Sequence, residues 1–237
     1  MNKQIWTIAK LQMRNIKVAY LVTGICMAAM LVQSVVAYVL YRCGIDYADK
    51  SNSTIGIGWY GWLVVLIAAI IMPLGNFTNI INLGGRRLNY LWGTLTGYVV
   101  LTGAASMFST VLCYAADRPL TRWGMIGTYW AAPDIYGWSA NGAVVAFLQQ
   151  WAFLLLVAVF IHTLVAAQSK WYGWVAAGLV VAVISVFTPI KPLRDAEVWF
   201  FKMIIFNPSW LLQIVACLVL AGAIYALNKP IFDRRAV

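Results

Sequence analysis

Residues 143–167 read AVVAFLQQWAFLLLVAVFIHTLVAA, a stretch without a charged side chain. A helix needs about 20 apolar residues to cross the hydrocarbon core of a bilayer, which is roughly 30 Å thick. This stretch is therefore long enough to span a membrane. Five other runs of 20 or more residues also lack Asp, Glu, Lys and Arg: 18–41, 51–85, 88–116, 171–190 and 203–228.

We expect an all-α membrane protein in which six helices cross the bilayer. The expected spans lie near residues 18–40, 56–74, 91–115, 143–167, 171–188 and 209–227. They occupy most of the 237 residues, so we expect residues 1–237 to form one transmembrane domain. The composition excludes a soluble domain, because 63% of the residues are hydrophobic and 10% are charged. In soluble domains about half of the residues are hydrophobic and about a quarter are charged.

The net charge of +10 does not indicate a partner nucleic acid, because the basic residues form short caps between apolar runs rather than one patch. These residues instead predict the orientation. With both termini in the cytoplasm, the inner segments carry ten Lys and Arg and the outer loops carry seven, which favours this orientation. We expect a multi-pass protein of the cell membrane. Its first apolar run is long enough to span, so we expect no cleaved signal peptide.

Residues 3–17 predict an amphipathic helix with two distinct sides. The basic side carries Lys3, Lys10, Arg14 and Lys17, and the apolar side carries Ile5, Ile8, Ala9, Met13 and Ile16. Such a helix lies in the membrane plane with its basic side toward anionic lipid headgroups. The alternative is that the basic residues act only as an anchor that fixes the topology.

Residues 75–90, GNFTNIINLGGRRLNY, predict a short helix at the cytoplasmic surface between the second and third spans. A polar stripe recurs there at three- and four-residue spacing, formed by Asn79, Asn82, Arg86 and Asn89 and opposed by Ile80, Ile81 and Leu83. Glycine tolerates backbone angles that other residues avoid, so Gly84 and Gly85 predict a sharp turn. Arg86 and Arg87 would hold this turn on the inner side.

Two outer segments have compositions of their own. Residues 117–142 are rich in Trp and Tyr. We assign these rings to the aromatic belt at the membrane interface, with a folded cap as the alternative. Residues 189–208 contain three prolines, and residues 193–206 have a charged start and an apolar end. A helix of this length is too short to span, so we expect an interfacial or re-entrant hairpin before the last span.

Few residues could carry chemistry. The sequence lacks the phosphate-binding loop GxxxxGK[ST], and no acid lies inside an expected span. These features disfavour ATP hydrolysis by this chain, ion-coupled pumping and intramembrane hydrolysis. His162, the single histidine, is expected to pack between helices rather than bind a metal. The four cysteines lack metal-ligand spacing, and free thiols are the default, although Cys43 and Cys113 could form a disulfide.

Gln149 and Gln150 lie in the outer third of the fourth expected span. Amides are costly in lipid, so both should face the bundle or a wet cavity. Two interpretations follow: hydrogen bonding between helices, or contact with a substrate in a cavity.

The segment NLGGRRLNYLWG, residues 82–93, resembles a signature of ABC-2 type transporter permeases. In these small six-span permeases of the drug and antimicrobial-peptide export type, Leu-Gly-x-Ser-Arg-Arg/Lys precedes aromatic and small residues. The family has an N-terminal elbow helix, six spans, a cytoplasmic coupling helix between spans two and three, and re-entrant outer helices before span six. The elements expected for this chain follow the same order. Gly85 departs from the family, which commonly has Ser or Thr there.

The resemblance implies a permease subunit that is not itself an enzyme. It would form half of a membrane channel with a second copy or a paralogue, and two separate ATPase subunits would drive it. ATP and Mg²⁺ would be held by those partners, so this chain itself would need no cofactor. Its substrate would be amphipathic or apolar: an antimicrobial peptide, a drug or a lipid. The coupling segment would seat on the ATPase through Asn76, Asn79, Asn82, Leu83, Gly84, Gly85, Arg86 and Arg87.

Three other functions fit a membrane chain without a phosphate-binding loop. The substrate-binding subunit of an energy-coupling-factor vitamin importer also has six spans, but it should lack a long amphipathic segment between spans two and three. A membrane enzyme acting on lipids would need clustered polar residues at one membrane face, and the sequence indicates none. A non-transporting immunity or sensor subunit is compatible with every feature of the sequence.

Overall fold

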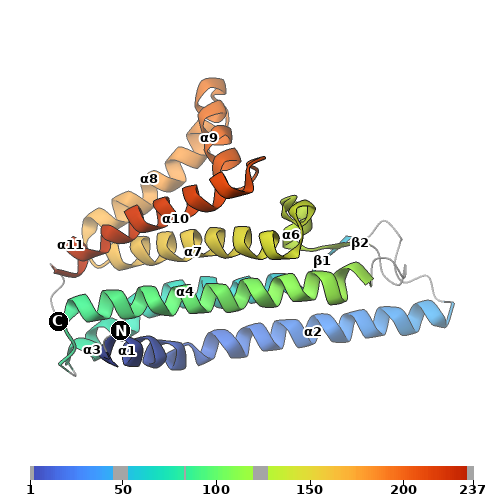
Figure 1. Cartoon of the computed structure of the whole chain (residues 1–237), viewed down its shortest axis with the longest axis horizontal. Coiled ribbons are helices and arrows are strands. Elements are labelled where there is room, and N and C mark those ends of the chain that lie inside the picture. The colour runs from blue at the N-terminus through green and yellow to red at the C-terminus, as the bar shows by residue number, and fades with distance from the viewer. Residues whose placement is uncertain (1–2, 45–52, 83, 120–127, 234–237) are drawn as a thin grey trace.

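The computed structural model describes residues 3–44, 53–82, 84–119 and 128–233, which are mostly helical (Figure 1). The main helices are α1 (Lys3–Asn15), α2 (Lys17–Arg42), α3 (Tyr60–Asn82), α4 (Arg87–Leu112), α7 (Ala143–Ala167), α8 (Trp171–Phe187), α9 (Lys191–Ile204), α10 (Trp210–Ala226) and α11 (Asn228–Asp233). The shorter elements are β1 (Ser53–Ile55), η1 (Ile57–Trp59), η2 (Cys113–Asp117), β2 (Thr128–Trp130), α6 (Ala132–Ile135) and η3 (Trp138–Asn141).

Several helices are long and apolar enough to cross a membrane, which confirms the expectation of an all-α membrane protein. Within the described ranges there are five such stretches: Lys17–Leu40, Ile57–Gly75, Arg87–Asp117, Ala143–Ala167 and Trp210–Asp233. α8 and α9 meet the same criteria only as a pair, and they are bent by 113° between them. The expected fifth span, 171–188, is therefore the first arm of this bent pair. α8 alone has 17 residues, the lower limit of a spanning helix.

α7 is the central helix, and it packs against α3, α4 and α10. Buried alanines lie in this core: Ala68 and Ala69 of α3, Ala158 of α7 and Ala221 of α10. Small side chains let helices approach closely, so van der Waals packing can hold them together in lipid, where the hydrophobic effect does not. α7 begins and ends where its span was expected. It starts after Gly142, whose φ of +87° suits glycine.

α2 and the α8–α9 pair lie on opposite sides of the bundle (Figure 1). Only 12% of the α2 span is buried, against 56% of the α7 span. Large apolar side chains cover the exposed faces of α2 and α8. This distribution suits helices that contact lipid hydrocarbon over most of their surface.

The two ends of the bundle are built differently. α1, α11 and the turn between α3 and α4 lie together at one end, which we call the α3–α4 end (Figure 1). At the other end β1 and β2 pair in parallel, with Thr54 opposite Tyr129, and we call this the β1–β2 end. Which end faces the cytoplasm stays a prediction.

At the β1–β2 end, Tyr136 and Trp138 pack into a cap, which is the alternative for residues 117–142, whereas Trp130 is 48% exposed and the aromatic belt stays a prediction for it. Trp138 is 1% exposed, and its Nε1 donates to the carbonyl oxygen of Ile205 at 2.9 Å. Tyr136 stacks on Trp62 with ring centroids 6.0 Å apart. Aromatic content alone does not reveal such tertiary contacts. Trp123 and the rest of 120–127 lie outside the described residues.

A separate coupling helix is not formed between α3 and α4. The apolar stretch ends at Gly75, yet α3 continues to Asn82. Gly75 weakens a helix by only about 1 kcal/mol, and the burial of Phe77 and Ile80 offsets this cost. The expected short helix is therefore the last part of α3.

Candidate functional site

Polar side chains at the end of α3 are exposed beside a buried apolar side. Asn79 and Asn82 are exposed in the last two turns, and Arg86 is exposed just before α4. Ile80 lies between Asn79 and Asn82 in the sequence and is only 4% exposed. We call Asn79, Asn82 and Arg86 the polar edge. Leu83 and the side chain of Asn76 lie outside the described part of the chain.

The turn after α3 requires glycine at both of its positions. The N–H of Gly84 donates to the carbonyl oxygen of Ile81, and that of Gly85 donates to Ile80, both at 2.9 Å. These two bonds define a Schellman motif, in which the first residue past the helix is left-handed. Gly84 accordingly has a φ of +82°. A Cβ on Gly85 would lie 2.7 Å from the carbonyl oxygen of Ile80, so Ser or Thr does not fit there.

Arg87 binds the last residues of the chain that the structure describes. Its Nη1 donates to the main-chain oxygen of Phe232 at 3.0 Å and also to that of Asp233. The last carbonyl groups of a helix lack partners within it and form the negative end of its dipole. Arg87 satisfies two of these carbonyls in α11. It is therefore an anchor between α4 and α11.

Three aromatic rings, one of them from Phe232, pack against one another at this end of the bundle. Phe77 of α3, Tyr90 of α4 and Phe232 of α11 are fully buried, with ring centroids 5.2, 4.7 and 5.3 Å apart. Their tilted and edge-on arrangement is the one that ring quadrupoles favour. The Tyr90 hydroxyl also donates to the carbonyl oxygen of Met72 at 3.2 Å. The end of α3, the start of α4 and α11 therefore form one packed unit.

α1 is part of this unit because it packs along α4. A Cβ on Gly93 would lie 2.7 Å from Cγ2 of Ile8, so the two helices are in close contact. The Nε2 of Gln12 donates to Oγ1 of Thr94 at 2.7 Å, and both residues are fully buried. The expected apolar side of α1 is confirmed in part, since Ile8 is buried there. Gln12 belongs to the same side, which its polarity did not predict.

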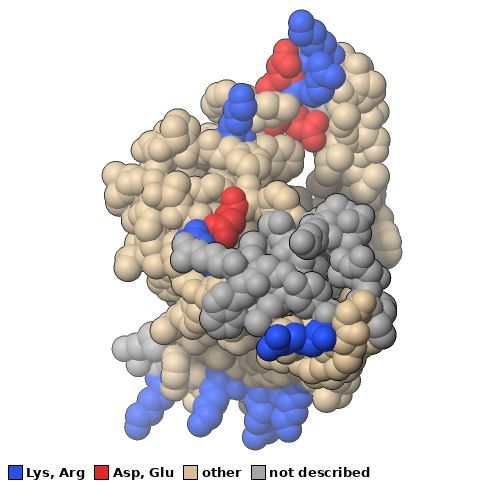
Figure 2. Space-filling model, turned by 90° about the vertical axis from the view of Figure 1, so that its right-hand side faces the viewer, with Lys and Arg blue, Asp and Glu red and all other residues tan. Residues whose placement is uncertain are grey.

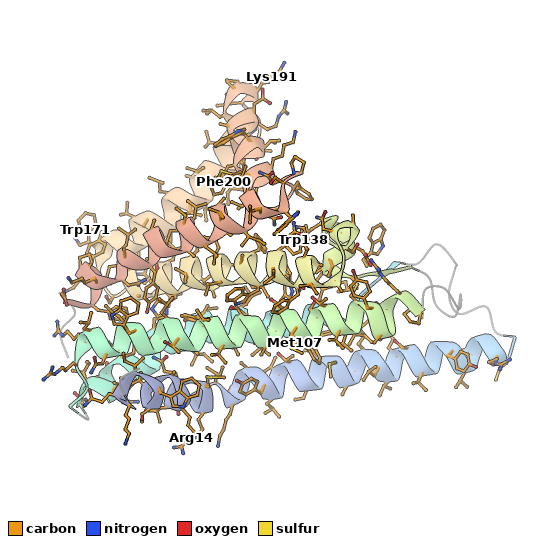
Figure 3. All side chains as sticks on the ribbon, in the orientation of Figure 1. Arg14, Met107, Trp138, Trp171, Lys191 and Phe200 are labelled. Atoms are coloured by element: carbon orange, nitrogen blue, oxygen red, sulfur yellow. The ribbon has the colours of Figure 1, made fainter. Side chains whose placement is uncertain are left out.

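The opposite side of α1 is basic and exposed. Lys3, Lys10 and Arg14 belong to it, and Lys17, which was expected on the same helix, is exposed at the start of α2. Figure 2 shows Lys and Arg side chains along the lower edge of the molecule without Asp or Glu between them. Arg14 points away from the bundle in Figure 3. This side can therefore reach anionic headgroups while the other side stays packed on α4.

Gln149 and Gln150 are buried between helices. The Nε2 of Gln149 donates to Oε1 of Gln213 in α10, and Gln213 in turn donates to the carbonyl oxygen of Ile204 at 3.1 Å. Gln150 accepts a hydrogen bond from Thr110 of α4 at 3.2 Å. Both residues thus make the interhelical bonds of the first interpretation. Gln149 also lines a pocket of about 280 Å³. Its contact with a substrate stays a prediction.

His162 is fully buried, and its Nδ1 shares a hydrogen bond of 2.8 Å with the Tyr98 hydroxyl. The histidine therefore packs between α4 and α7, as expected. The described residues contain no group of three or more His, Cys, Asp and Glu that could hold a metal ion. Cys43 is exposed and Cys113 is buried, and both are free thiols.

Acidic residues near the β1–β2 end make contacts that the sequence did not indicate. Asp117, at the end of the α4 span, is 1% exposed and accepts a hydrogen bond from the N–H of Ile57 at 3.0 Å. Asp134 forms an ion pair with Arg118. Partial burial acts to raise the pKa of Asp134, but hydrogen bonds from Arg118 and Ser139 and the charge of Arg118 together hold this pKa below its usual value.

Comparison of the chain with protein-family models, with curated proteins and with solved structures finds no match. The candidate functional site is therefore defined by geometry alone. It consists of the polar edge, the glycine turn and the packed unit behind them.

Proposed function

We propose that this chain is the permease subunit of an ABC transporter of the cell membrane, with two separate ATPase subunits and a second permease copy or paralogue. ATP and Mg²⁺ would be bound by the ATPases. The substrate would be an amphipathic or apolar molecule such as an antimicrobial peptide, a drug or a lipid. In this proposal the α3–α4 end faces the cytoplasm and α1 is the elbow helix.

One observation carries the proposal: the exposed polar edge is fixed to several helices at once. The edge begins at Asn79, about one helical turn after the apolar stretch of α3 ends at Gly75, which would let it contact a soluble partner. Behind it, Phe77, Tyr90 and Phe232 pack α3, α4 and α11 together. A force applied at the edge would therefore reach three membrane helices, which is what coupling to an ATPase requires.

The bent α8–α9 pair gives additional support. It precedes the last span and turns back by 113°, as the outer hairpin of such a permease would. α10 then returns the chain to the α3–α4 end, where Arg87 binds α11 (Figure 1). In this proposal, closure of the ATPases moves the polar edge, and the spans tilt with it.

Charge reversal at the polar edge tests the proposal. Arg86→Glu should abolish transport and uncouple ATP hydrolysis while the chain still inserts, because the Arg86 side chain is exposed. Lys170→Glu is the matched control, since it reverses an exposed charge between α7 and α8. The measurement is copurification with the ATPase, ATP hydrolysis and substrate export in vesicles. Normal export by Arg86→Glu would refute the coupling role, and a copurified vitamin would favour an importer subunit.

A further inference from the structure

Two apolar pockets lie along the same side of α7 and α10. The first, of about 530 Å³, is lined by residues of α7, α8, α9 and α10. The second, of about 540 Å³, lies nearer α11 and includes Pro230 and Ile231. Phe160 and Ile224 line both pockets. The pockets are therefore parts of one apolar groove, which we call the α7–α10 groove.

The groove is long enough for an acyl chain. Along α7 its lining extends from Phe153 to Ala167, a rise of about 21 Å at 1.5 Å per residue. One leaflet contributes about 15 Å to the hydrocarbon core of a bilayer. A chain that fills one leaflet thus fits along the groove without leaving it.

Lipid has direct access to the groove. α8 covers its outer side, yet α8 contacts the rest of the bundle mainly through α7 and α9. Leu179 and Ile184 line the first pocket and are also 61% and 51% exposed. The groove is therefore open to the surface that faces the bilayer, and the molecules present at that surface are phospholipids.

One acidic side chain distinguishes this groove from a plain apolar surface. Glu197 of α9 is the one charged residue among the described residues that line the first pocket. A carboxylate in an apolar environment is costly unless a positive group pairs with it. Within residues 3–44, 53–82, 84–119 and 128–233 the ion pair that forms is Arg118–Asp134, so Glu197 has no ion-pair partner among these residues.

A positive side chain lies next to Glu197. Arg194 is exposed three residues earlier in α9, and residues three apart are neighbours on a helix surface. The two side chains make no ion pair with each other. Figure 3 shows Lys191 at the free tip of α9 and Phe200 closer to the bundle, so Arg194 lies on the tip side of Glu197, which lines the groove. A headgroup with a phosphate and an amine would complement both charges.

We propose that the α7–α10 groove binds a membrane phospholipid with a primary amine headgroup, such as phosphatidylethanolamine. Its acyl chain lies along Phe160 and Ile224. Its ammonium group donates to the Glu197 carboxylate, and its phosphate accepts from Arg194. This site does not depend on the transport proposal, because its ligand comes from the bilayer and no ATPase takes part.

The test is native mass spectrometry of the full-length chain in detergent, with equal amounts of dioleoyl phosphatidylethanolamine and dioleoyl phosphatidylglycerol. The wild-type chain should retain the amine lipid about tenfold better, because a hydrogen bond to a charged group contributes about 1.4 kcal/mol or more. Glu197→Gln should remove this preference. Asp195→Asn is the matched control: it neutralises an acid of the same helix that does not line the groove, and it should keep the preference.

A second pair of variants tests the acyl-chain site. Val180 lines the first pocket, whereas its neighbour Val181 does not and is 64% exposed. Val180→Trp should fill the groove and lower the retention of both lipids, and Val181→Trp should leave retention unchanged. Equal retention of the two lipids by the wild-type chain, or an unchanged preference in Glu197→Gln, would overturn the proposal. So would a dimer that Val180→Trp dissociates without loss of lipid, since a second copy would then occupy the groove.

Discussion

Ile8 of α1 lies directly against Gly93 of α4, so close that a Cβ on the glycine would be 2.7 Å from Ile8 Cγ2 and 3.1 Å from the main-chain oxygen of Ile5. The first helix is therefore held by a contact between backbones as well as by its amphipathic character. Any side chain at position 93 must push α1 away from α4.

Substitution of this glycine should loosen α1. Gly93→Ala is expected to lower the free energy of unfolding by about 1–3 kcal/mol, because overpacking forces the backbone to shift. Gly97→Ala, one turn further along α4, is the control, since its Cβ would meet Gln12 at an ordinary distance of 3.7 Å. Thermal unfolding in detergent measures both. Equal midpoints for the two variants would show that α1 does not depend on this contact.

Gly85 in the glycine turn and Gly75 inside α3 predict opposite effects of substitution by alanine. Gly85→Ala should destabilise the chain by about 1–3 kcal/mol, because its Cβ would clash with the main-chain oxygen of Ile80. Gly75→Ala should stabilise it by up to about 1 kcal/mol, because the position is helical and has nothing within 4 Å of the new Cβ. Thermal unfolding distinguishes the two. A stabilising Gly85→Ala would contradict the Schellman geometry.

The bond between Gln149 and Gln213 should appear as an energetic coupling. A double-mutant cycle with Gln149→Leu and Gln213→Leu is expected to give a coupling of about 0.6 kcal/mol, the average for interhelical hydrogen bonds in membrane proteins. A cycle with Gln150→Leu in place of Gln149→Leu should give a coupling near zero, because Gln150 bonds to Thr110 instead. Similar couplings in the two cycles would contradict the observed pairing.

The ion pair of Arg118 and Asp134 predicts a dependence of stability on pH. The pKa of Asp134 is lowered in the folded chain. The ion pair therefore adds to the free energy of unfolding above the usual pKa of about 3.9, and this stabilisation is lost as the pH falls through the pKa of Asp134 in the folded chain. The pair is partly exposed, so the contribution is at most about 1 kcal/mol. The difference in midpoint between the wild-type chain and Asp134→Asn should shrink below about pH 4. A difference that grows toward acid pH would contradict this sign.

Much of the helical framework could be predicted from the sequence, because lipid imposes a local rule. A long uncharged run must be helical to satisfy its own backbone, so α7 follows from residues 143–167 without knowledge of any contact. The turn at Gly84 and Gly85 is equally local, since it depends on the conformations that glycine allows.

The rest depends on contacts between distant residues. Arg87 meets Phe232 across 145 residues, so nothing in the neighbouring sequence separates its role from that of Arg86. Trp138 is buried because it reaches Ile205, 67 residues later, and composition alone favoured an interfacial ring. α3 extends to Asn82 because tertiary packing buries Phe77 and Ile80, which outweighs the change from apolar to polar residues after Gly75.

The hydrogen bond between Gln149 and Gln213 also has a consequence for biosynthesis. The two residues are 64 positions apart, so a ribosome that adds about 5–20 residues per second makes the second one roughly 3–13 s after the first. During this interval α7 enters the membrane before the Gln149 amide can bond to Gln213. The hydrogen bond between the two helices can therefore form only after α10 has been synthesised.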